Sequence, residues 1–367
     1  MIDQQTNLRN KRFVMEGMAA VCACEDADLA DRLAAVYAPD AAWRGSHPMN
    51  EAQGTEAIAD VAWAPLRHAL PDVERRDLIL VGGEYEDTQF VATMGHYVGR
   101  WERDWLGIPA SGGILALRYG EVHALREGRI VQSSCLWDVL DAIHQCGPMG
   151  QGFRPLAPSW GTEMRWLAPL TNDGIVLSPQ DPDEGETSIA QTLGMHRALA
   201  DYDDRQDLSA SSLETMPQRD HWHPRMMWYG PAGIGTGRGL RGFVEAHQLP
   251  FREVFPNRQG GAQITDRSQG GHYIRIGDGP YSVTGGWPSV RARHDQTVPG
   301  RGDLFGSGPT GRDVQMRVMD FYLHHEGLIR ENWVPIDVID LLLQMGIDVM
   351  RRVREQVGSE RRGLWRG

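Results

Sequence analysis

The chain has 367 residues, of which 41% are hydrophobic and 23% charged, and its net charge is −12. This length and composition are typical of a globular protein large enough for two domains. The negative charge argues against nucleic-acid binding, and the lack of a long hydrophobic run or a leader-like N-terminus argues against a membrane protein, so we expect a cytoplasmic location.

Cysteine and lysine usage excludes several kinds of chemistry. The four cysteines, Cys22, Cys24, Cys135 and Cys146, show no Cys-x-x-Cys spacing, and we interpret them as free thiols. Lys11 is the only lysine and lies near the N-terminus, which argues against Schiff-base, pyridoxal-phosphate and Walker-type phosphate chemistry. We therefore expect no metal and no organic cofactor, and acid–base work is left to Asp, Glu, His and Tyr.

The first half begins with helices and continues with strands. Hydrophobic residues at helical spacing predict helices within residues 6–36, and a further helix follows from Gly54 to about His68. Short β-branched and aromatic runs predict strands at 77–82, 89–101, 114–125 and 130–137. Helices followed by a meander of strands indicate an α+β fold rather than alternating βαβ units.

The second half repeats this order after a Pro- and Gly-rich linker. Helices are predicted at 186–201 and 240–249, and strands near 262–265, 272–276, 281–287, 314–324 and 329–334. Gly237-Arg-Gly239-Leu-Arg-Gly242 satisfies a dinucleotide-binding pattern, but no buried strand precedes it, so we do not expect a nucleotide.

A stretch of 21 residues occurs twice. Residues 127–147 and 326–346 align without a gap with 8 identities, including Asp138 with Asp337. At the same offset of 199 residues, Glu121 aligns with Asp320. The sequence therefore predicts a duplicated domain, with repeats at 1–149 and 186–367 and a linker at 150–185.

These residues carry a family resemblance. The run from Pro309-Thr-Gly311 through Asp320-Phe-Tyr, Glu326-Gly and Trp333 to Gln344-Met-Gly346 resembles the C-terminal half of SnoaL-like polyketide cyclases, and 95–147 resembles it in repeat one. The resemblance implies two tandem cone-shaped α+β barrels of the nuclear-transport-factor-like type, each with N-terminal helices over a curved antiparallel sheet. Relatives carry out aldol cyclisation, dehydration, isomerisation or retro-aldol cleavage without a cofactor, and some only bind.

The resemblance also selects catalytic candidates. In this family the Asp seven residues before the Gln of the Gln-Leu-Gly motif is the general acid/base, which implies Asp138 and Asp337 here. Burial in an apolar cone could raise the pKa of such a carboxyl toward neutrality. The alternative is that both cap a helix in an Asp-x-x-Asp box. We prefer repeat two, with Asp337, as the main site.

A further set of residues is expected at the pockets. The family's Gly-x-His-x-Gly segment places Tyr97 in the His slot with His96 beside it as a proton donor, and Trp287 in the corresponding slot of repeat two. Aromatic residues near the expected pockets favour a flat ligand, and His221-x-His223 is interpreted as a pocket-mouth pair rather than a metal site. The predicted binding residues are Tyr97, Trp43, His221, His223, Trp228, Trp287 and Trp333.

Together these features predict a cofactor-independent acid–base enzyme, an aldol cyclase or isomerase, acting on an aromatic or polycyclic carbonyl compound. One alternative is a lyase or dehydratase that uses the same Asp on an aromatic catabolite. The other is a binding module without turnover. We expect the two repeats to form an intramolecular pseudo-dimer, and further homo-oligomerisation is left open.

Overall fold

The computed structural model describes residues 3–146, 166–200, 217–261, 271–296 and 303–363. It contains two separate sheets, each with its own helices, so the chain is an α+β protein with two domains. The predicted strand at 262–265 lies outside the described residues. None of the described helices combines the length and hydrophobicity needed to span a bilayer.

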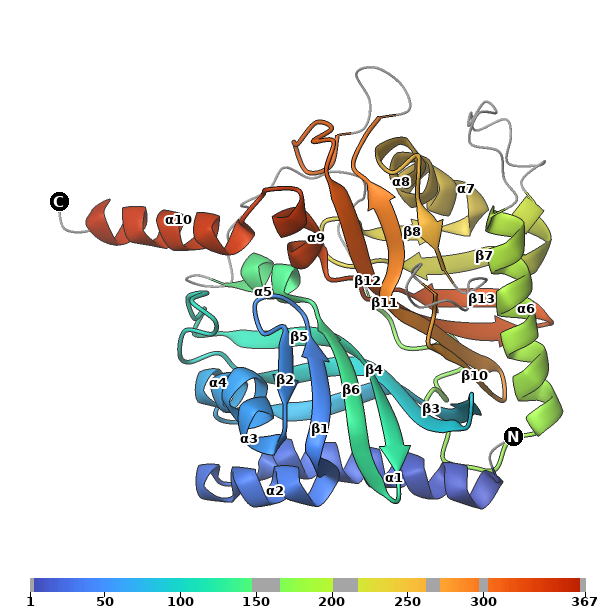
Figure 1. Ribbon diagram of the computed structural model, residues 1–367, viewed down its shortest axis with the longest axis horizontal. Coiled ribbons are helices and arrows are strands. Elements are labelled where there is room, and N and C mark those ends of the chain that lie inside the picture. The colour runs from blue at the N-terminus through green and yellow to red at the C-terminus, as the bar shows by residue number, and fades with distance from the viewer. Residues whose placement is uncertain (1–2, 147–165, 201–216, 262–270, 297–302, 364–367) are drawn as a thin grey trace.

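The first domain has helices below a six-stranded sheet (Figure 1). Its elements are α1 (Gln4–Ala23), η1 (Asp26–Asp28), α2 (Leu29–Val36), β1 (Tyr37–Gly45), β2 (Glu51–Gln53), α3 (Thr55–Ile58), η2 (Ala59–Trp63), α4 (Ala64–Ala69), β3 (Glu74–Tyr85), β4 (Thr88–Arg100), β5 (Ile114–Arg126), β6 (Arg129–Trp137) and α5 (Val139–Gln145). The strand order is β2-β1-β6-β5-β4-β3. The sheet is mixed rather than purely antiparallel, because β1 runs parallel to β6.

The second domain repeats this topology. Its elements are α6 (Pro182–Ala200), η5 (Pro217–His221), β7 (Trp222–Tyr229), β8 (Thr236–Arg238), α7 (Gly239–Phe243), η6 (Val244–Gln248), α8 (Leu249–Val254), β9 (Gln259–Gly260), β10 (Ile274–Asp278), β11 (Tyr281–Arg293), β12 (Asp313–His325), β13 (Leu328–Trp333), α9 (Val338–Gln344) and α10 (Val349–Gly363). Its strand order, β8-β7-β13-β12-β11-β10, corresponds strand by strand to the order β2-β1-β6-β5-β4-β3 of the first domain. Strand β7 runs parallel to β13, and the short β9 lies beside β11. Helix α6 begins inside the predicted linker.

The two sheets pack against each other through the faces turned away from their helices (Figure 1). This interface is a second hydrophobic core that includes Val81 and Met94 of the first domain and Val283 and Phe321 of the second. A Cβ added at Gly120 of the first domain would lie 2.4 Å from Cγ of Pro335 in the second domain, so only glycine fits at position 120. The two sheets are therefore in close contact at this point, and the expected internal pseudo-dimer stays a prediction.

Polar contacts also join the domains. The Nζ of Lys11, on α1, lies 2.6 Å from Oδ2 of Asp278 on β10, and both side chains are at most 1% exposed. A buried pair of this kind is costly to break, because removing one partner leaves an uncompensated charge. The described end of the linker packs here too, where Gly174 and Val176 hydrogen-bond to Leu80 of β3.

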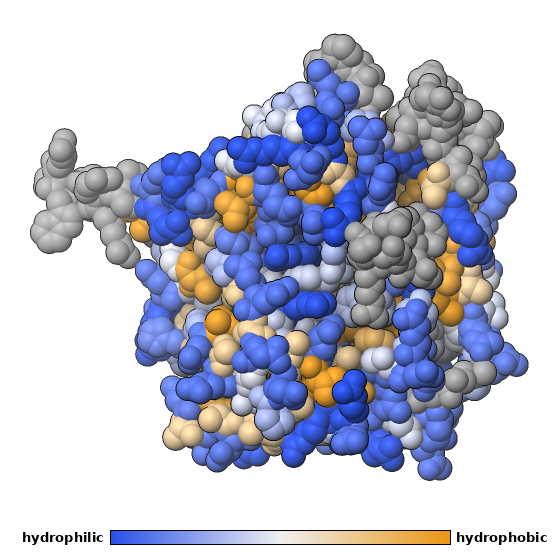
Figure 2. Space-filling view, in the orientation of Figure 1, coloured by the Kyte–Doolittle hydropathy of each residue, from blue (hydrophilic) through white to orange (hydrophobic). Residues whose placement is uncertain are grey.

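The surface is mostly hydrophilic, as the composition of the chain predicts for a globular protein. On the face shown in Figure 2 hydrophilic residues dominate and hydrophobic residues form small, separate patches. The large hydrophobic side chains that are exposed among the described residues are Ile114, Leu167, Leu170 and Leu343. Single exposed residues of this kind are normal on a globular protein.

Candidate functional site

The second domain encloses a cavity of about 590 Å³ between its sheet and its helices. This volume falls in the range of small-molecule sites. The walls come from α6, β7, the α7–α8 segment, β9, β11, β12 and β13. Most lining side chains are hydrophobic. Apart from His247 on η6, the polar ones lie on α6, at β9, before β10, within β11, on β12 and on β13: His196, Arg258, Gln259, His272, Ser289, Asp320, Tyr322 and Asn332.

Aromatic side chains form one part of the wall. The imidazole of His247 stacks on Trp228 with ring centroids 4.0 Å apart and an interplanar angle of 17°. Phe243 lies beside both rings, and Trp222 and Phe251 extend the aromatic surface. Burial lowers the pKa of His247 to about 3, so the ring is neutral and packs like an aromatic residue. Flat ligands fit such a surface best.

Polar side chains form a strip along another part of the wall. Asp320 and Tyr322 are two residues apart on β12 and therefore face the same side of the sheet. The Oη of Tyr322 lies 3.0 Å from Nε2 of His196 on α6, and the His196 ring contacts the ring of His272 at 5.9 Å. Asn332, on β13, places Nδ2 3.5 Å from Oδ1 of Asp320.

Asp320 is the carboxylate of this cavity. Its side chain is buried, and burial raises the pKa to about 7, while hydrogen bonds from Asn332 and Tyr322 act in the other direction. Within the described part of the chain no arginine or lysine forms an ion pair with it. A carboxyl group with a pKa near neutrality can both accept and return a proton at physiological pH.

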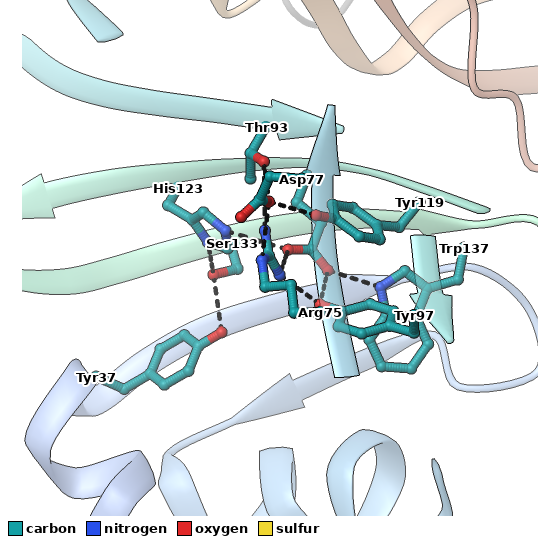
Figure 3. Close-up of polar contacts among 10 residues, drawn as sticks. Tyr37, Arg75, Asp77, Thr93, Tyr97, Tyr119, His123, Ser133 and Trp137 are labelled. Carbon is teal, nitrogen blue, oxygen red and sulfur yellow. Dashed lines mark hydrogen bonds and ion pairs between the residues drawn. The ribbon is translucent and has the colours of Figure 1, made fainter. Parts of the chain in front are cut away.

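The interior of the first domain is built differently. Arg75 of β3 donates to Oε2 of Glu121 at 2.8 Å, to the Oη of Tyr97 at 2.5 Å and to Oδ1 of Asp77 at 3.0 Å. Figure 3 shows Arg75 pointing inward among Asp77, Tyr97, Tyr119 and Trp137. All of these side chains are nearly inaccessible to solvent, which makes the network part of the core.

Glu121 is held as a carboxylate in this network. Burial alone would raise its pKa, but the charge of Arg75 and the hydrogen bonds it accepts bring the pKa below the ordinary value. Tyr97 and Trp137 both donate to Oε1, at 2.7 and 2.8 Å. A permanently ionised, fully paired carboxylate is a poor proton acceptor.

Aromatic side chains fill the rest of the first interior. Trp137 contacts several other rings, with centroids 5.2 to 6.4 Å apart, and each of the rings concerned is at most 2% exposed: Trp43, Trp63, Tyr97 and Trp105. Tyr97 and Trp43, predicted as ligand-binding residues, are therefore core residues bonded to or packed against their own domain.

Trp287 does not occupy the position equivalent to Tyr97 that the sequence predicts for it. In the first domain Tyr97 pairs across the sheet with Leu117. The residue equivalent to Leu117 in the second domain is Met316, which pairs with Val290, so Val290 is the structural counterpart of Tyr97. A β-bulge causes the difference, because β11 advances from Gly286 to Val290 while β12 advances only from Val318 to Met316. Trp287 lies outside the cavity lining, and the guanidinium carbon of Arg317 is 4.8 Å from the centroid of its ring.

Asp138 and Asp337 have equivalent contacts, and neither lines the cavity. In each, Oδ1 accepts from the backbone N–H three residues on, as in the helix-cap alternative. In each, Oδ2 reaches the other domain: Asp138 accepts from the N–H of Ala232 at 2.9 Å, and Asp337 from that of His47 at 2.9 Å.

An arginine completes both contacts. Arg118 lies 2.8 Å from Oδ2 of Asp138, and Arg317 lies 2.9 Å from Oδ2 of Asp337. Burial raises the pKa of Asp337 to about 6, against the opposing effect of Arg317. All oxygens of both carboxylates therefore have partners within the protein.

The other predicted residues lie apart from one another. His96 is half-buried beside Trp166, and burial followed by the charge of Arg118 lowers its pKa to about 4. Trp333 stacks on Tyr229 in the interface between the sheets. His221 lies on the turn before β7, and His223 lies 3.6 Å from the exposed Glu326. Of the predicted binding residues, only Trp228 lines the cavity.

Neither a metal nor a nucleotide is suggested by the described residues. No group of three or more His, Cys, Asp or Glu side chains in these ranges is arranged to hold a metal ion. The Gly237–Gly242 segment ends β8, a three-residue strand at the edge of the sheet that runs antiparallel to β7, so it lacks the buried parallel strand that precedes the helix in a dinucleotide site.

The most informative residue of the cavity was visible in the sequence but not selected. Asp320 aligns with Glu121, so both repeats carry an acid in the middle of a strand with apolar neighbours. A charged residue in such a place is rarely buried without a partner or a function. His196 and His272 give no comparable signal, because a lone histidine on a helix or before a strand is common.

Comparison with known proteins supports the fold. Residues 18–133 match the family model described as a SnoaL-like domain. No curated protein matches the chain.

Similar solved structures include a protein described as a SnoaL-like polyketide cyclase from Jannaschia sp. CCS1, with 17% identity over 42% of this chain and 99% of that chain and a TM-score of 0.33. IdmH from Streptomyces antibioticus has 21% identity over 35% of this chain and 93% of that chain, with a TM-score of 0.30. TsrD from Streptomyces laurentii has 21% identity over 41% and 99%, also with a TM-score of 0.30. The family model thus places a SnoaL-like domain in the first half of the chain, and the second half has the same strand order as the first.

Proposed function

We propose that the protein is a cofactor-independent acid–base enzyme of the SnoaL-like type, an aldol cyclase or isomerase, and that its reaction takes place in the cavity of the second domain. The substrate would be an aromatic or polycyclic carbonyl compound. Asp320 would act as the general base and acid. The observation that carries this proposal is a contrast between two buried acids: Asp320 borders a cavity and has no ion-pair partner among the described residues, whereas Glu121 is paired with Arg75 in a filled interior.

The proposed reaction begins with removal of a proton from the carbon next to a carbonyl group. The Asp320 carboxylate takes this proton, and the electron pair of the C–H bond moves to the carbonyl oxygen to form an enolate. Tyr322 and Asn332, whose hydroxyl and amide groups can donate, lie near enough to stabilise that oxygen. The enolate carbon then either attacks a second carbonyl group, whose oxygen takes the proton back from the Asp320 carboxylic acid to become a hydroxyl, or the enolate is reprotonated by that acid at a different carbon.

The aromatic wall supports the choice of substrate. Trp228, His247 and Phe243 offer flat, uncharged surfaces of the size of a bicyclic ring system. The neutral histidines of the cavity can hydrogen-bond a ligand without fixing a charge. An uncharged carbonyl compound with fused rings fits both properties.

The direct test measures proton abstraction with a simple probe. We would incubate 2-tetralone with the protein in heavy water near neutral pH and follow deuterium incorporation at the α-carbon by NMR. The wild type should accelerate exchange above the buffer rate, and Asp320→Asn should lower that acceleration by about 10² or more.

The control comes from the first domain. Tyr97→Phe removes a hydroxyl from the filled interior and should leave the exchange rate unchanged. A wild-type protein that binds 2-tetralone without accelerating exchange, or an Asp320→Asn variant with full activity, would contradict the proposal. Loss of exchange in Tyr97→Phe alone would move the chemistry to the first domain.

A further inference from the structure

The β-bulge in β11 brings a polar residue into the cavity. Between Gly286 and Val290 the strand advances two residues more than its partner β12, and the bulge includes Ser289, which lines the cavity. In the first domain, β4 pairs with β5 without any shift from Gln89 to Arg100. The bulge is therefore a feature of the second domain, and bulges are frequent beside functional sites.

Ser289 holds the ring of His272. The Oγ of Ser289 lies 2.5 Å from Nε2 of His272, and both residues are 2% exposed and line the cavity. Gly286 also touches this ring, since a Cβ added there would lie 3.1 Å from Cδ2 of His272. The edge of the ring that carries Nε2 and Cδ2 thus faces the bulge, and the edge that carries Nδ1 faces away from it.

The Nδ1 atom of His272 is a buried polar atom, and no hydrogen bond to it exists within the described part of the chain. In one tautomer Nε2 accepts a hydrogen bond from Ser289, and Nδ1 carries a hydrogen that finds no acceptor among the described residues. In the other tautomer Nε2 donates to Ser289, and Nδ1 is an acceptor that finds no donor there. Either state leaves a buried polar atom unsatisfied, which costs free energy that a ligand group could recover.

The same pair is poorly suited to nucleophilic catalysis. An activated serine needs a basic imidazole, usually oriented by a carboxylate on its second nitrogen. Burial, then the neighbouring His196 and Arg275, lowers the pKa of His272 well below its ordinary value, and no carboxylate contacts Nδ1 in the described residues. A neutral, weakly basic ring is suited to hydrogen bonding instead.

We propose that His272 is a specificity-determining residue, whose Nδ1 hydrogen-bonds a hydroxyl or carbonyl oxygen that the ligand carries in addition to the carbonyl group beside Asp320. The inference uses the cavity of the proposed function and adds the requirement for a second oxygen substituent on the aromatic ligand. His196 lies between the two positions, since it contacts both Tyr322 and His272. The ligand class is therefore an aromatic compound with at least two separate oxygen groups.

The test compares ligands that differ only in hydroxyl groups. Naphthalene, 2-naphthol and a series of dihydroxynaphthalenes would be titrated against the protein, with binding followed through the fluorescence of Trp222 and Trp228, which line the cavity. The wild type should bind at least one dihydroxynaphthalene about tenfold more tightly than 2-naphthol, which corresponds to ~1.4 kcal/mol. His272→Phe keeps an aromatic ring and should remove most of this preference while changing the affinity for naphthalene by less than about twofold.

Two further variants make the result specific. Ser289→Ala leaves His272 in place but frees its ring, so the preference should fall to an intermediate value even if His272→Phe fails to fold. His223→Phe, outside the cavity, should have no effect. An unchanged preference in a folded His272→Phe protein, or no preference in the wild type, would overturn the proposal. Asp320→Asn should retain the preference, so this test can fail while the proposed reaction stands.

Discussion

Glu121 and Asp320 occupy equivalent positions in β5 and β12, and each pairs across its sheet with a threonine, Thr93 or Thr284. Glu121 lies 2.8 Å from the guanidinium of Arg75, whereas Asp320 has no such partner among the described residues and borders a cavity. Burial therefore leads to opposite results, a permanently charged core residue in one domain and a group that titrates near neutrality in the other.

Replacing Asp320 with Asn should change the dependence of stability on pH. The pKa of Asp320 is raised in the folded state, so between about pH 4 and pH 7 the folded protein binds more protons than the unfolded chain. Its contribution to stability is present at low pH and is lost as the pH rises through 7. At pH 8 Asp320→Asn should therefore be more stable than the wild type, by roughly 2–4 kcal/mol.

Chemical denaturation at several pH values would check this effect. The advantage of Asp320→Asn should shrink as the pH falls toward 4, where both side chains are uncharged. An advantage that stays constant from pH 8 to pH 4, or a variant less stable at pH 8, would contradict a raised pKa for Asp320.

Arg75→Met should strongly destabilise the first domain. The substitution leaves the carboxylate of Glu121 buried without its positive partner, a change that typically costs about 3–5 kcal/mol. Adding Glu121→Gln should recover much of the loss, because the unpaired charge is then gone. A double-mutant cycle by urea denaturation measures the coupling, and independent, additive effects would argue against a tight ion pair.

Asp138→Ala should weaken the contact between the domains. It removes the helix cap at Asp141 and the acceptor for the N–H of Ala232, for an expected loss of about 1–3 kcal/mol. Asp141→Ala is a suitable control, because it removes a second partner of Arg118 but leaves the interdomain hydrogen bond. Differential scanning calorimetry should show a clearly larger fall in Tm for Asp138→Ala, and equal shifts would mean that the contact with Ala232 contributes little.

Much of the fold could be predicted because the evidence for it is local or repeated. The β-branched and aromatic runs of β4, β5 and β12 and the 199-residue repeat follow directly from the residues, and the structure shows the same strand order in both domains. Strand β1, which pairs in parallel with β6, was not predicted, since its partner lies far away in the sequence. The interface between the sheets likewise depends on which face each strand turns outward.

The site was harder to predict because three-dimensional context decides the role of each residue. Asp138 and Asp337 match a motif, but their second oxygen meets a backbone N–H of the other domain, which no spacing reveals. The bulge at Gly286–Val290 moves Trp287 out of the position that alignment assigns to it. The assignment of the active site to the second repeat stays a prediction, and the proposed catalytic residue there is Asp320 in place of Asp337.

The pH dependence of α-carbon exchange in 2-tetralone tests the central claim most directly. After subtraction of the buffer rate, the wild-type rate should rise with pH and level off near pH 7, as Asp320 becomes ionised. Asp320→Asn should lose this rise and about 10² or more of the rate, whereas Asp337→Asn, at the carboxyl with a pKa of about 6, should keep the wild-type profile. A profile that survives in Asp320→Asn and disappears in Asp337→Asn would contradict the account and assign the proton transfer to Asp337.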